Sequence, residues 1–263
     1  MQPKKWGLLV ELILIGVILL TGVVSIFCIL NKPQLKTEKD LDAAAHSRFA
    51  SFLKENDLKR ADYPPELMDL LVRNPEAEEF VLHYPIWKDK DFSVDMSDCI
   101  GGSEVPLLMQ WDTRWGYRAY GNTVMGVSGC GPTCLSMVAL FLLQDEKMDP
   151  GWMADFSTDN GFCVPGNGTS WTLMSEGAEQ LGLRATELPL DKNRILANLQ
   201  IGNPIICIMG EGDFTTTGHF IVLTGCKDGM ITVNDPNSRE NSRKTWSYDQ
   251  IKDQIRNLWV YTT

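Results

Sequence analysis

The sequence predicts an α+β fold, with helices in its first part and antiparallel strands in its last part. Between residues 41 and 200, several stretches place apolar residues at helical spacing. After residue 203, apolar runs of strand length alternate with short polar turns. Helices followed by a run of strands are typical of this class. The 263 residues, 44% of them hydrophobic, are enough for a sizeable core.

The chain begins with an apolar segment. Between residues 7 and 30 the only charged side chain is Glu11, and a helix needs roughly 20 apolar residues to span a bilayer. We expect an uncleaved membrane anchor at residues 1–31, since the run is long for a signal peptide and no small-residue cleavage site follows it. Lys4 and Lys5 favour a single-pass cell-membrane protein whose remaining chain is extracytoplasmic.

Residues 32–103 are predicted to form a linker and an acidic helical segment. The helices are expected at 41–59, 64–72 and 75–82, where prolines and polar residues interrupt the apolar periodicity. The aromatic stretch 85–102 is expected to be a loop with one short strand.

The most informative stretch is Gly129-Cys130-Gly131-Pro132-Thr133. Helical periodicity follows it, and a proline suits a first helical turn, so Cys130 lies near a helix start. The free N–H groups and the positive dipole end there favour a thiolate over a thiol, which makes the sulfur nucleophilic. Cys134, one turn further on, fits a small core residue.

The rest of the chain is predicted to alternate loops, short helices and strands. Residues 155–169 are expected to be a long surface loop. The other expected elements are helices at 171–181, 191–200 and 248–256 and strands at 204–209, 219–226, 230–234 and 258–261.

His219 is the candidate general base. It is one of three histidines and begins a predicted strand after a polar loop, whereas His46 and His83 belong to the helical segment. A histidine next to a buried strand can also be an ordinary core residue. Gln110 is a candidate oxyanion donor, because its side-chain amide carries N–H groups, although it could equally be a solvated loop residue.

The acid that orients His219 depends on how two strands pair. A three-residue loop after Cys226 would place Asp235 diagonal to His219, within reach of a hydrogen bond. A two-residue Asp-Gly turn would instead direct Asn234 toward the imidazole. We expect the three-residue loop, with Asp235 as the orienting residue.

Composition excludes several classes of function. The net charge of −10 and the lack of a basic stripe argue against nucleic acid as a partner. The seven cysteines form no CxxC pair, so we expect neither a metal site nor a disulfide framework, and no cofactor is indicated. A single bridge between Cys99 and Cys163 stays open.

Four motifs occur in chain order: Gln110-x-Asp112-x-x-Trp115, Gly129-Cys130-Gly131-Pro132, Gly218-His219 and Asn234-Asp235-Pro236. With them, residues 104–263 resemble the papain-like cysteine peptidases related to the bacteriocin double-glycine leader peptidases. The likeness is to stand-alone, membrane-anchored members from Gram-positive bacteria.

This resemblance implies a papain-like fold and a thiol peptidase acting on a peptide or protein substrate, without a cofactor. It also implies the roles of the site residues: Cys130 as nucleophile, His219 as base, Asp235 as its orienter and Gln110 as part of the oxyanion hole. Two alternatives stay open. One is a cell-wall amidase or acyl-transferase with the same triad, and the other is a non-catalytic, membrane-tethered binding module.

Overall fold

The computed structural model describes residues 35–263. Of these, Lys36–Thr263 form one compact unit. The anchor predicted at residues 1–31 lies outside the described residues. In the part that is described, no helix combines the length and the apolar composition needed to cross a bilayer.

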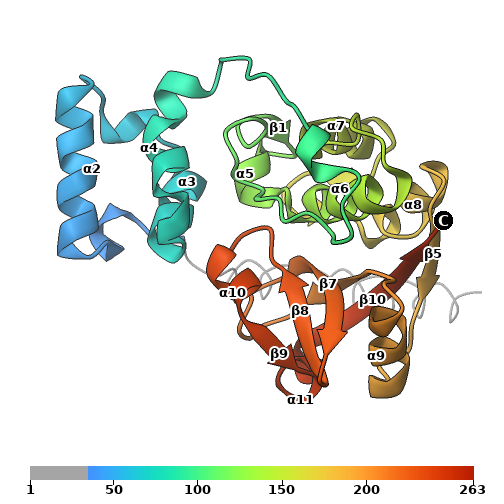
Figure 1. The fold of residues 1–263 in the computed structure, drawn as a ribbon. Coiled ribbons are helices and arrows are strands. Elements are labelled where there is room, and N and C mark those ends of the chain that lie inside the picture. Colours follow the sequence, from blue (N-terminus) through green and yellow to red (C-terminus); the bar gives the residue numbers. More distant parts are fainter. Residues whose placement is uncertain (1–34) are drawn as a thin grey trace, which may run out of the picture. The chain divides into compact units, whose positions relative to one another are not determined.

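The helical segment contains three α-helices: α2 (Ala43–Glu55), α3 (Pro65–Arg73) and α4 (Glu78–Trp87), coloured blue to green-cyan in Figure 1. All three overlap predicted helices, but α4 extends through Pro85 to Trp87. The prediction of a short strand within 85–102 is wrong. The regular structure in that stretch is the end of α4 and one 3₁₀ turn.

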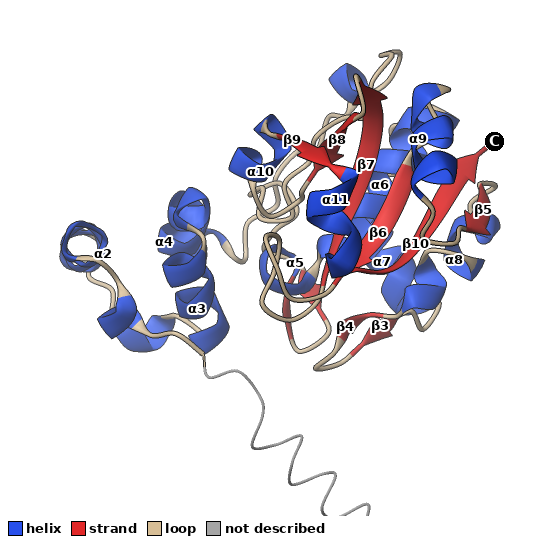
Figure 2. Cartoon of the chain, turned by 90° about the horizontal axis from the view of Figure 1, so that it is seen from below, coloured by secondary structure: helices blue, strands red, loops and turns tan. Residues whose placement is uncertain are grey.

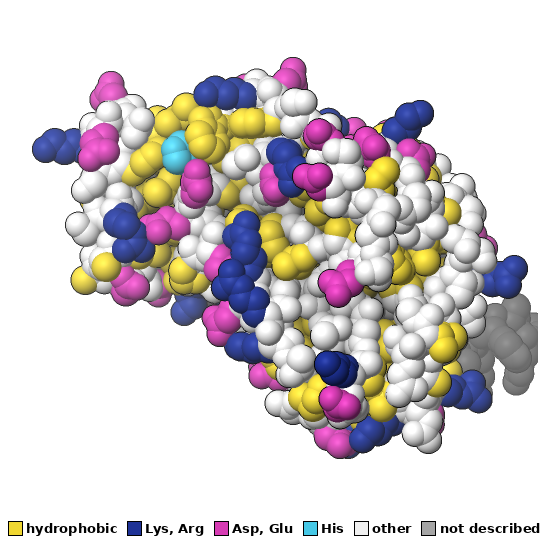
Figure 3. Space-filling model, viewed as in Figure 1, with side chains coloured by type: hydrophobic (Ala, Val, Ile, Leu, Met, Phe, Trp, Pro, Cys, Tyr) yellow, Lys and Arg dark blue, Asp and Glu magenta, His cyan; other side chains and the backbone are white. Residues whose placement is uncertain are grey.

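The helical segment shares a core with the later part of the chain. The Phe80 ring of α4 stacks on the Tyr117 ring at 4.5 Å between centroids, and the Tyr117 hydroxyl donates to the Phe80 carbonyl at 2.9 Å. Hydrophobic side chains also gather on the outer surface of this segment (Figure 3, upper left). The Phe80–Tyr117 contacts pack the segment against the part of the unit that carries the candidate site.

Helix α6 (Cys130–Leu143) is the central helix of the unit, and its residues 131–140 are all buried. Helix α7 (Pro150–Asp159) packs beside it (Figure 2). The Asp149 side chain caps α7 by accepting from the N–H groups of Gly151 and Trp152. The loop predicted at 155–169 is therefore wrong in its first third, and its remainder forms a small hairpin of β3 (Cys163–Val164) and β4 (Gly168–Thr169).

Shorter elements connect the larger ones. In place of the helix predicted at 171–181, the structure has a 3₁₀ turn (Trp171–Leu173) and the short helix α8 (Glu176–Gln180). The α-helix predicted at 248–256 ends at Ile251 and is labelled α11. The bounds of these elements are β1 (Ala119–Tyr120), β2 (Thr123–Val124), α5 (Met125–Ser128), α8 (Glu176–Gln180), α9 (Lys192–Gln200), α10 (Arg239–Arg243) and α11 (Tyr248–Ile251).

A six-stranded antiparallel sheet forms the second half of the unit, in the order β5-β10-β6-β7-β8-β9 (Figure 2). This confirms the α+β class. The strands are β5 (Arg184–Glu187), β6 (Ile205–Met209), β7 (His219–Lys227), β8 (Met230–Asn234), β9 (Thr245–Ser247) and β10 (Ile255–Thr262).

Both faces of this sheet are buried. Phe220 and Val222 of β7 belong to the core that contains α6, whereas Ile221 and Leu223 belong to the core that contains α9 and α11. Side chains alternate along a strand, which explains the division. The N-terminus of α6 consequently lies where β7 begins, so Cys130 is brought to the end of the sheet that carries His219.

The turn between β7 and β8 differs from the prediction. Lys227 pairs with Met230, so the connection is a two-residue turn of Asp228 and Gly229. Both residues have positive φ, 53° and 78°. Such a turn matches the twist of a hairpin, and Asp-Gly is a preferred sequence for it. The expected three-residue loop is therefore wrong.

A bulge in β7 nevertheless produces the expected register beyond it. Leu223 pairs with Val233 and Gly225 with Thr232, so Thr224 is the extra residue on its strand. Val222 consequently pairs with Asn234, and continuing this register by one residue places Asp235 opposite Ile221.

Candidate active site

Cys130 is the first residue of α6 and lies half-buried at the helix N-terminus. Gly131 makes this placement possible, because a Cβ atom there would lie only 2.6–2.7 Å from the side chain of Thr169 in β4. The backbone N–H groups of Gly131 and Phe220 help to lower the pKa of the Cys130 thiol. The surroundings of the sulfur thus stabilise a negative charge.

His219 begins β7 and has only 7% of its surface exposed. Its Nε2 atom lies 2.7 Å from Oδ1 of Asp235. The side chains of His219 and Cys130 also shift each other's pKa, raising that of His219 and lowering that of Cys130. The imidazole therefore interacts with both the sulfur of Cys130 and the carboxylate of Asp235.

Cys130, His219 and Asp235 change one another's pKa. Burial raises the pKa of Cys130, but the hydrogen bond and the charge of His219 outweigh that effect, and the pKa is lowered. Burial lowers the pKa of His219, yet the charge of Asp235 and its hydrogen bond raise it overall. The two shifts favour a thiolate beside an imidazolium.

Asp235 is 1% exposed, and its carboxylate is surrounded by donors. Oδ1 also accepts from the backbone N–H of Asn237 at 2.9 Å, and Oδ2 accepts from Nδ2 of Asn241 at 2.9 Å. Burial raises the pKa of Asp235, but the charge and hydrogen bond of His219 and these two donors lower it overall. The carboxylate is therefore kept ionised for its contact with the imidazole.

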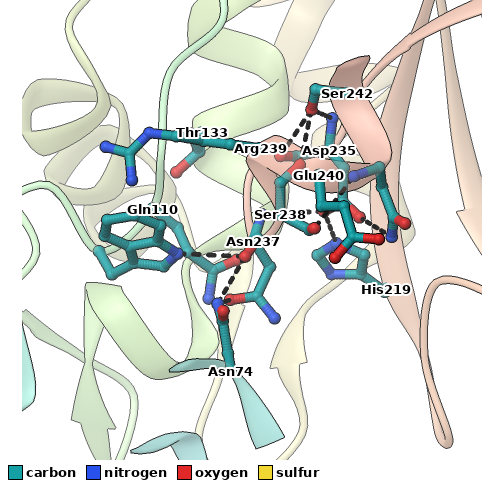
Figure 4. A network of polar contacts seen from close by, with 12 residues as sticks. Asn74, Gln110, Thr133, His219, Asp235, Asn237, Ser238, Arg239, Glu240 and Ser242 are labelled. Carbon is teal, nitrogen blue, oxygen red and sulfur yellow. Dashed lines mark hydrogen bonds and ion pairs between the residues drawn. The ribbon is translucent and has the colours of Figure 1, made fainter. Parts of the chain in front are cut away.

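Sequence reasoning missed the residues that hold Asp235. Asn237 and Asn241 donate to its carboxylate. Its backbone N–H donates to Oγ of Ser242 at 2.9 Å (Figure 4). They belong to the turn before α10 and to α10 itself. Ser238 is the N-cap of this helix, and a serine followed by polar helix formers was the available signal.

Asn234 points away from His219. Its side-chain amide donates to the carbonyls of Val105 and Pro106, at 3.0 and 3.1 Å. It therefore fastens the segment before Gln110 to β8, and the acid next to the imidazole is Asp235.

Gln110 is 3% exposed and lies against the turn that precedes Cys130. Its Nε2 donates to the carbonyls of Gly126 and Val127, at 3.0 and 3.2 Å. Its Oε1 has no hydrogen-bond partner among residues 35–263. Both amide hydrogens are thus engaged here, and the oxyanion role of Gln110 stays a prediction.

Cys134 is fully buried, and burial together with the charge of Cys130 raises its pKa well above the ordinary value. It is a core residue, as predicted. Cys99 and Cys163, like the other cysteines of the described range, are free.

Comparison of the sequence with known protein families gives one match. The sequence model of the Peptidase_C39 like family matches residues 103–263, nearly the range over which the resemblance was predicted. No curated protein matches.

Two solved structures are similar to the chain. One is the peptidase domain of Streptococcus ComA, a bifunctional ABC transporter of a quorum-sensing pathway, with 19% identity over 60% of this chain and 98% of that one and a TM-score of 0.40. The other, from Bacillus anthracis and described as a C39-like peptidase, has 17% identity over 61% and 96%, with a TM-score of 0.37. Because the family's sequence model covers more than half of the 263 residues, the chain belongs to the Peptidase_C39 like family.

Proposed function

We propose that this protein is a cysteine peptidase that hydrolyses peptide bonds with Cys130, His219 and Asp235 as its catalytic triad. The observation that carries the proposal is the 2.7 Å hydrogen bond between the imidazole Nε2 of His219 and the carboxylate of Asp235, together with the lowering of the pKa of Cys130 by the same imidazole. Membership in a peptidase family supports a peptide or protein as the substrate.

The reaction follows from the protonation states. The Cys130 thiolate attacks the carbonyl carbon of the scissile bond, and its S–C bond forms as the carbonyl oxygen becomes an oxyanion. The His219 imidazolium then donates its proton to the leaving amine, which departs as the C–N bond breaks. The neutral imidazole next takes a proton from water, the hydroxide attacks the thioester, and the thiolate is regenerated with release of the acid.

Asp235 holds the imidazole during both steps. Its buried carboxylate accepts from Nε2, so the other ring nitrogen faces the sulfur and exchanges the proton. The oxyanion develops beside the N-terminus of α6, and Gln110, whose amide donates to carbonyls of the preceding helix α5, is the candidate side-chain donor to it. Gln110 takes part if its amide turns from one of its two carbonyl acceptors toward the oxyanion.

We further propose that an N-terminal helix anchors the protein in the cell membrane of a Gram-positive bacterium, with the catalytic unit outside. The apolar run between residues 7 and 30, and Lys4 and Lys5 before it, support this placement.

The full-length protein incubated with a peptide library tests the activity. We expect hydrolysis that iodoacetamide abolishes by alkylating Cys130. Cleavage of peptidoglycan fragments without cleavage of any peptide would favour an amidase. Alkylation of Cys130 without any hydrolysis would favour a binding module.

A further inference from the structure

The stretch that carries Asp235 has little regular structure of its own. Strand β8 ends at Asn234, and the next element is α10, a helix of five residues. The partners of Asp235 besides His219 all belong to residues 237–242. The position of the triad carboxylate therefore depends on the conformation of residues 235–242.

A buried asparagine from the helical segment contacts this stretch. Nδ2 of Asn74, just after α3, donates to the backbone carbonyl of Asn237 at 2.6 Å and to its side-chain oxygen at 3.1 Å (Figure 4). Nε1 of Trp111 donates to the same backbone carbonyl at 3.2 Å. The residue whose N–H donates to Asp235 is thus held from outside its own loop.

Glu76 holds the beginning of α10. Its Oε1 accepts from Oγ of Ser238 at 3.2 Å and from the N–H of Glu240 at 3.1 Å, and its Oε2 accepts from the N–H of Arg239 at 3.1 Å. N–H groups in a first helical turn lack partners within the helix, and a carboxylate forms charge-assisted hydrogen bonds with them. The N–H of Glu76 in turn donates to Asn74 at 3.1 Å.

These bonds matter because so short a helix does not persist by itself. The first turn of a helix costs more conformational entropy than one hydrogen bond returns, so five residues need stabilisation from outside. Helix α10 carries Asn241 and Ser242, which contact Asp235. A contact that stabilises α10 consequently fixes the carboxylate.

We propose that Asn74 and Glu76 are positioning residues, which hold residues 235–242 in the conformation that keeps Asp235 bonded to His219. The proposal rests on the triad proposed above. Neither residue lies within the range 103–263 that the family's sequence model matches. The helical segment then contributes to the active site by positioning the triad carboxylate.

The test measures the full-length variants Glu76→Ala, Glu76→Gln and Asn74→Ala. Glu78→Ala is the matched control, because Glu78 forms an ion pair with Arg48 inside the helical segment. The first readout is the pH dependence of iodoacetamide alkylation at Cys130, followed by mass spectrometry of the peptide containing it. The second is kcat and KM with a cleaved peptide.

For Glu76→Ala we expect the alkylation midpoint to rise by about one pH unit, because a displaced Asp235 stabilises the imidazolium less. We expect kcat to fall about 10-fold with KM nearly unchanged, a fraction of the loss when a general base is removed. Glu76→Gln keeps an oxygen acceptor and should give a smaller shift in the same direction. Asn74→Ala should give a shift of the alkylation midpoint similar to that of Glu76→Gln. Glu78→Ala should have the midpoint and kcat of the wild type.

An unchanged midpoint and kcat in folded Glu76→Ala would overturn the proposal. If that variant does not fold, unchanged values in both Glu76→Gln and Asn74→Ala would overturn it equally. Alkylation needs no substrate, so the two proposals can fail separately. A wild type without hydrolysis would contradict the peptidase function, whereas an active wild type with unshifted variants would contradict the positioning role.

Discussion

The Nε2 atom of His219, the first residue of β7, lies 2.7 Å from Oδ1 of Asp235, which directly follows the end of β8, and a bulge at Thr224 sets the register that brings them together. Without the extra residue in β7, the register set by the two-residue turn would pair Asn234 with Leu223 and Asp235 with Val222, so Asn234 rather than Asp235 would lie on the face of His219. The bulge thus decides which of two neighbouring polar residues becomes the partner of His219.

Asp235→Asn should change the pH dependence of Cys130. The charge of Asp235 raises the pKa of His219, and charged His219 lowers the pKa of Cys130. Removing that charge lets the imidazolium lose its proton at lower pH, and the alkylation midpoint of Cys130 should rise. We expect kcat to fall about 10²- to 10⁴-fold, the range that general acid–base catalysis contributes. An unchanged midpoint would show that Asp235 does not stabilise the imidazolium.

Asn234→Ala should affect stability rather than chemistry. Its amide donates to the carbonyls of Val105 and Pro106, which would be left without that donor. We expect a loss of about 1–3 kcal/mol in the free energy of unfolding. Denaturant titration measures this loss. A shifted alkylation midpoint at Cys130 in this variant would instead indicate a site of the Cys-His-Asn kind.

Gln110→Ala tests the oxyanion prediction. If the amide donates to the oxyanion in the transition state, kcat should fall about 10²- to 10³-fold with little change in KM. Steady-state kinetics with a cleaved peptide supply both constants. A normal kcat in a folded variant would leave Gln110 with only its contacts to the carbonyls of Gly126 and Val127.

The membrane topology has a direct test. With Lys4 and Lys5 inside, residues 32–263 should face the wall or the medium. Protease added to intact protoplasts should then digest the catalytic unit. Protection of that unit until the protoplasts are lysed would reverse the orientation.

The sequence predicted the parts of the site that local patterns encode. Cys130 was recognisable from glycines and a proline before a buried helix, and His219 from its place at a strand start. The sequence Asp228-Gly229 is typical of a two-residue hairpin turn, and that is the turn the structure contains, in place of the predicted three-residue loop. A bulge at Thr224 gives the register that the three-residue loop would have given beyond it, and no local sequence pattern predicts that bulge.

Contacts between distant segments were not predictable in this way. Asn74 and Glu76 contact residues more than 160 positions away, and periodicity or propensity carries no information about such pairs. Helix α7 is also absent from the predicted helices, although a local signal marks its start. Asp149 is an N-cap residue, and Pro150 follows it at the first helical position.

The most direct test of the triad compares Cys130→Ala with Cys134→Ala in the full-length protein, using a peptide that the wild type cleaves. Cys134 is a matched control, because it is a buried cysteine one turn along the same helix. Cys130→Ala should lose nearly all activity while keeping its fold, since the nucleophile is removed. Cys134→Ala should retain activity, with a lower melting temperature from the small cavity. Comparable loss of activity in folded Cys134→Ala, or full activity in Cys130→Ala, would contradict the assignment of Cys130 as the nucleophile.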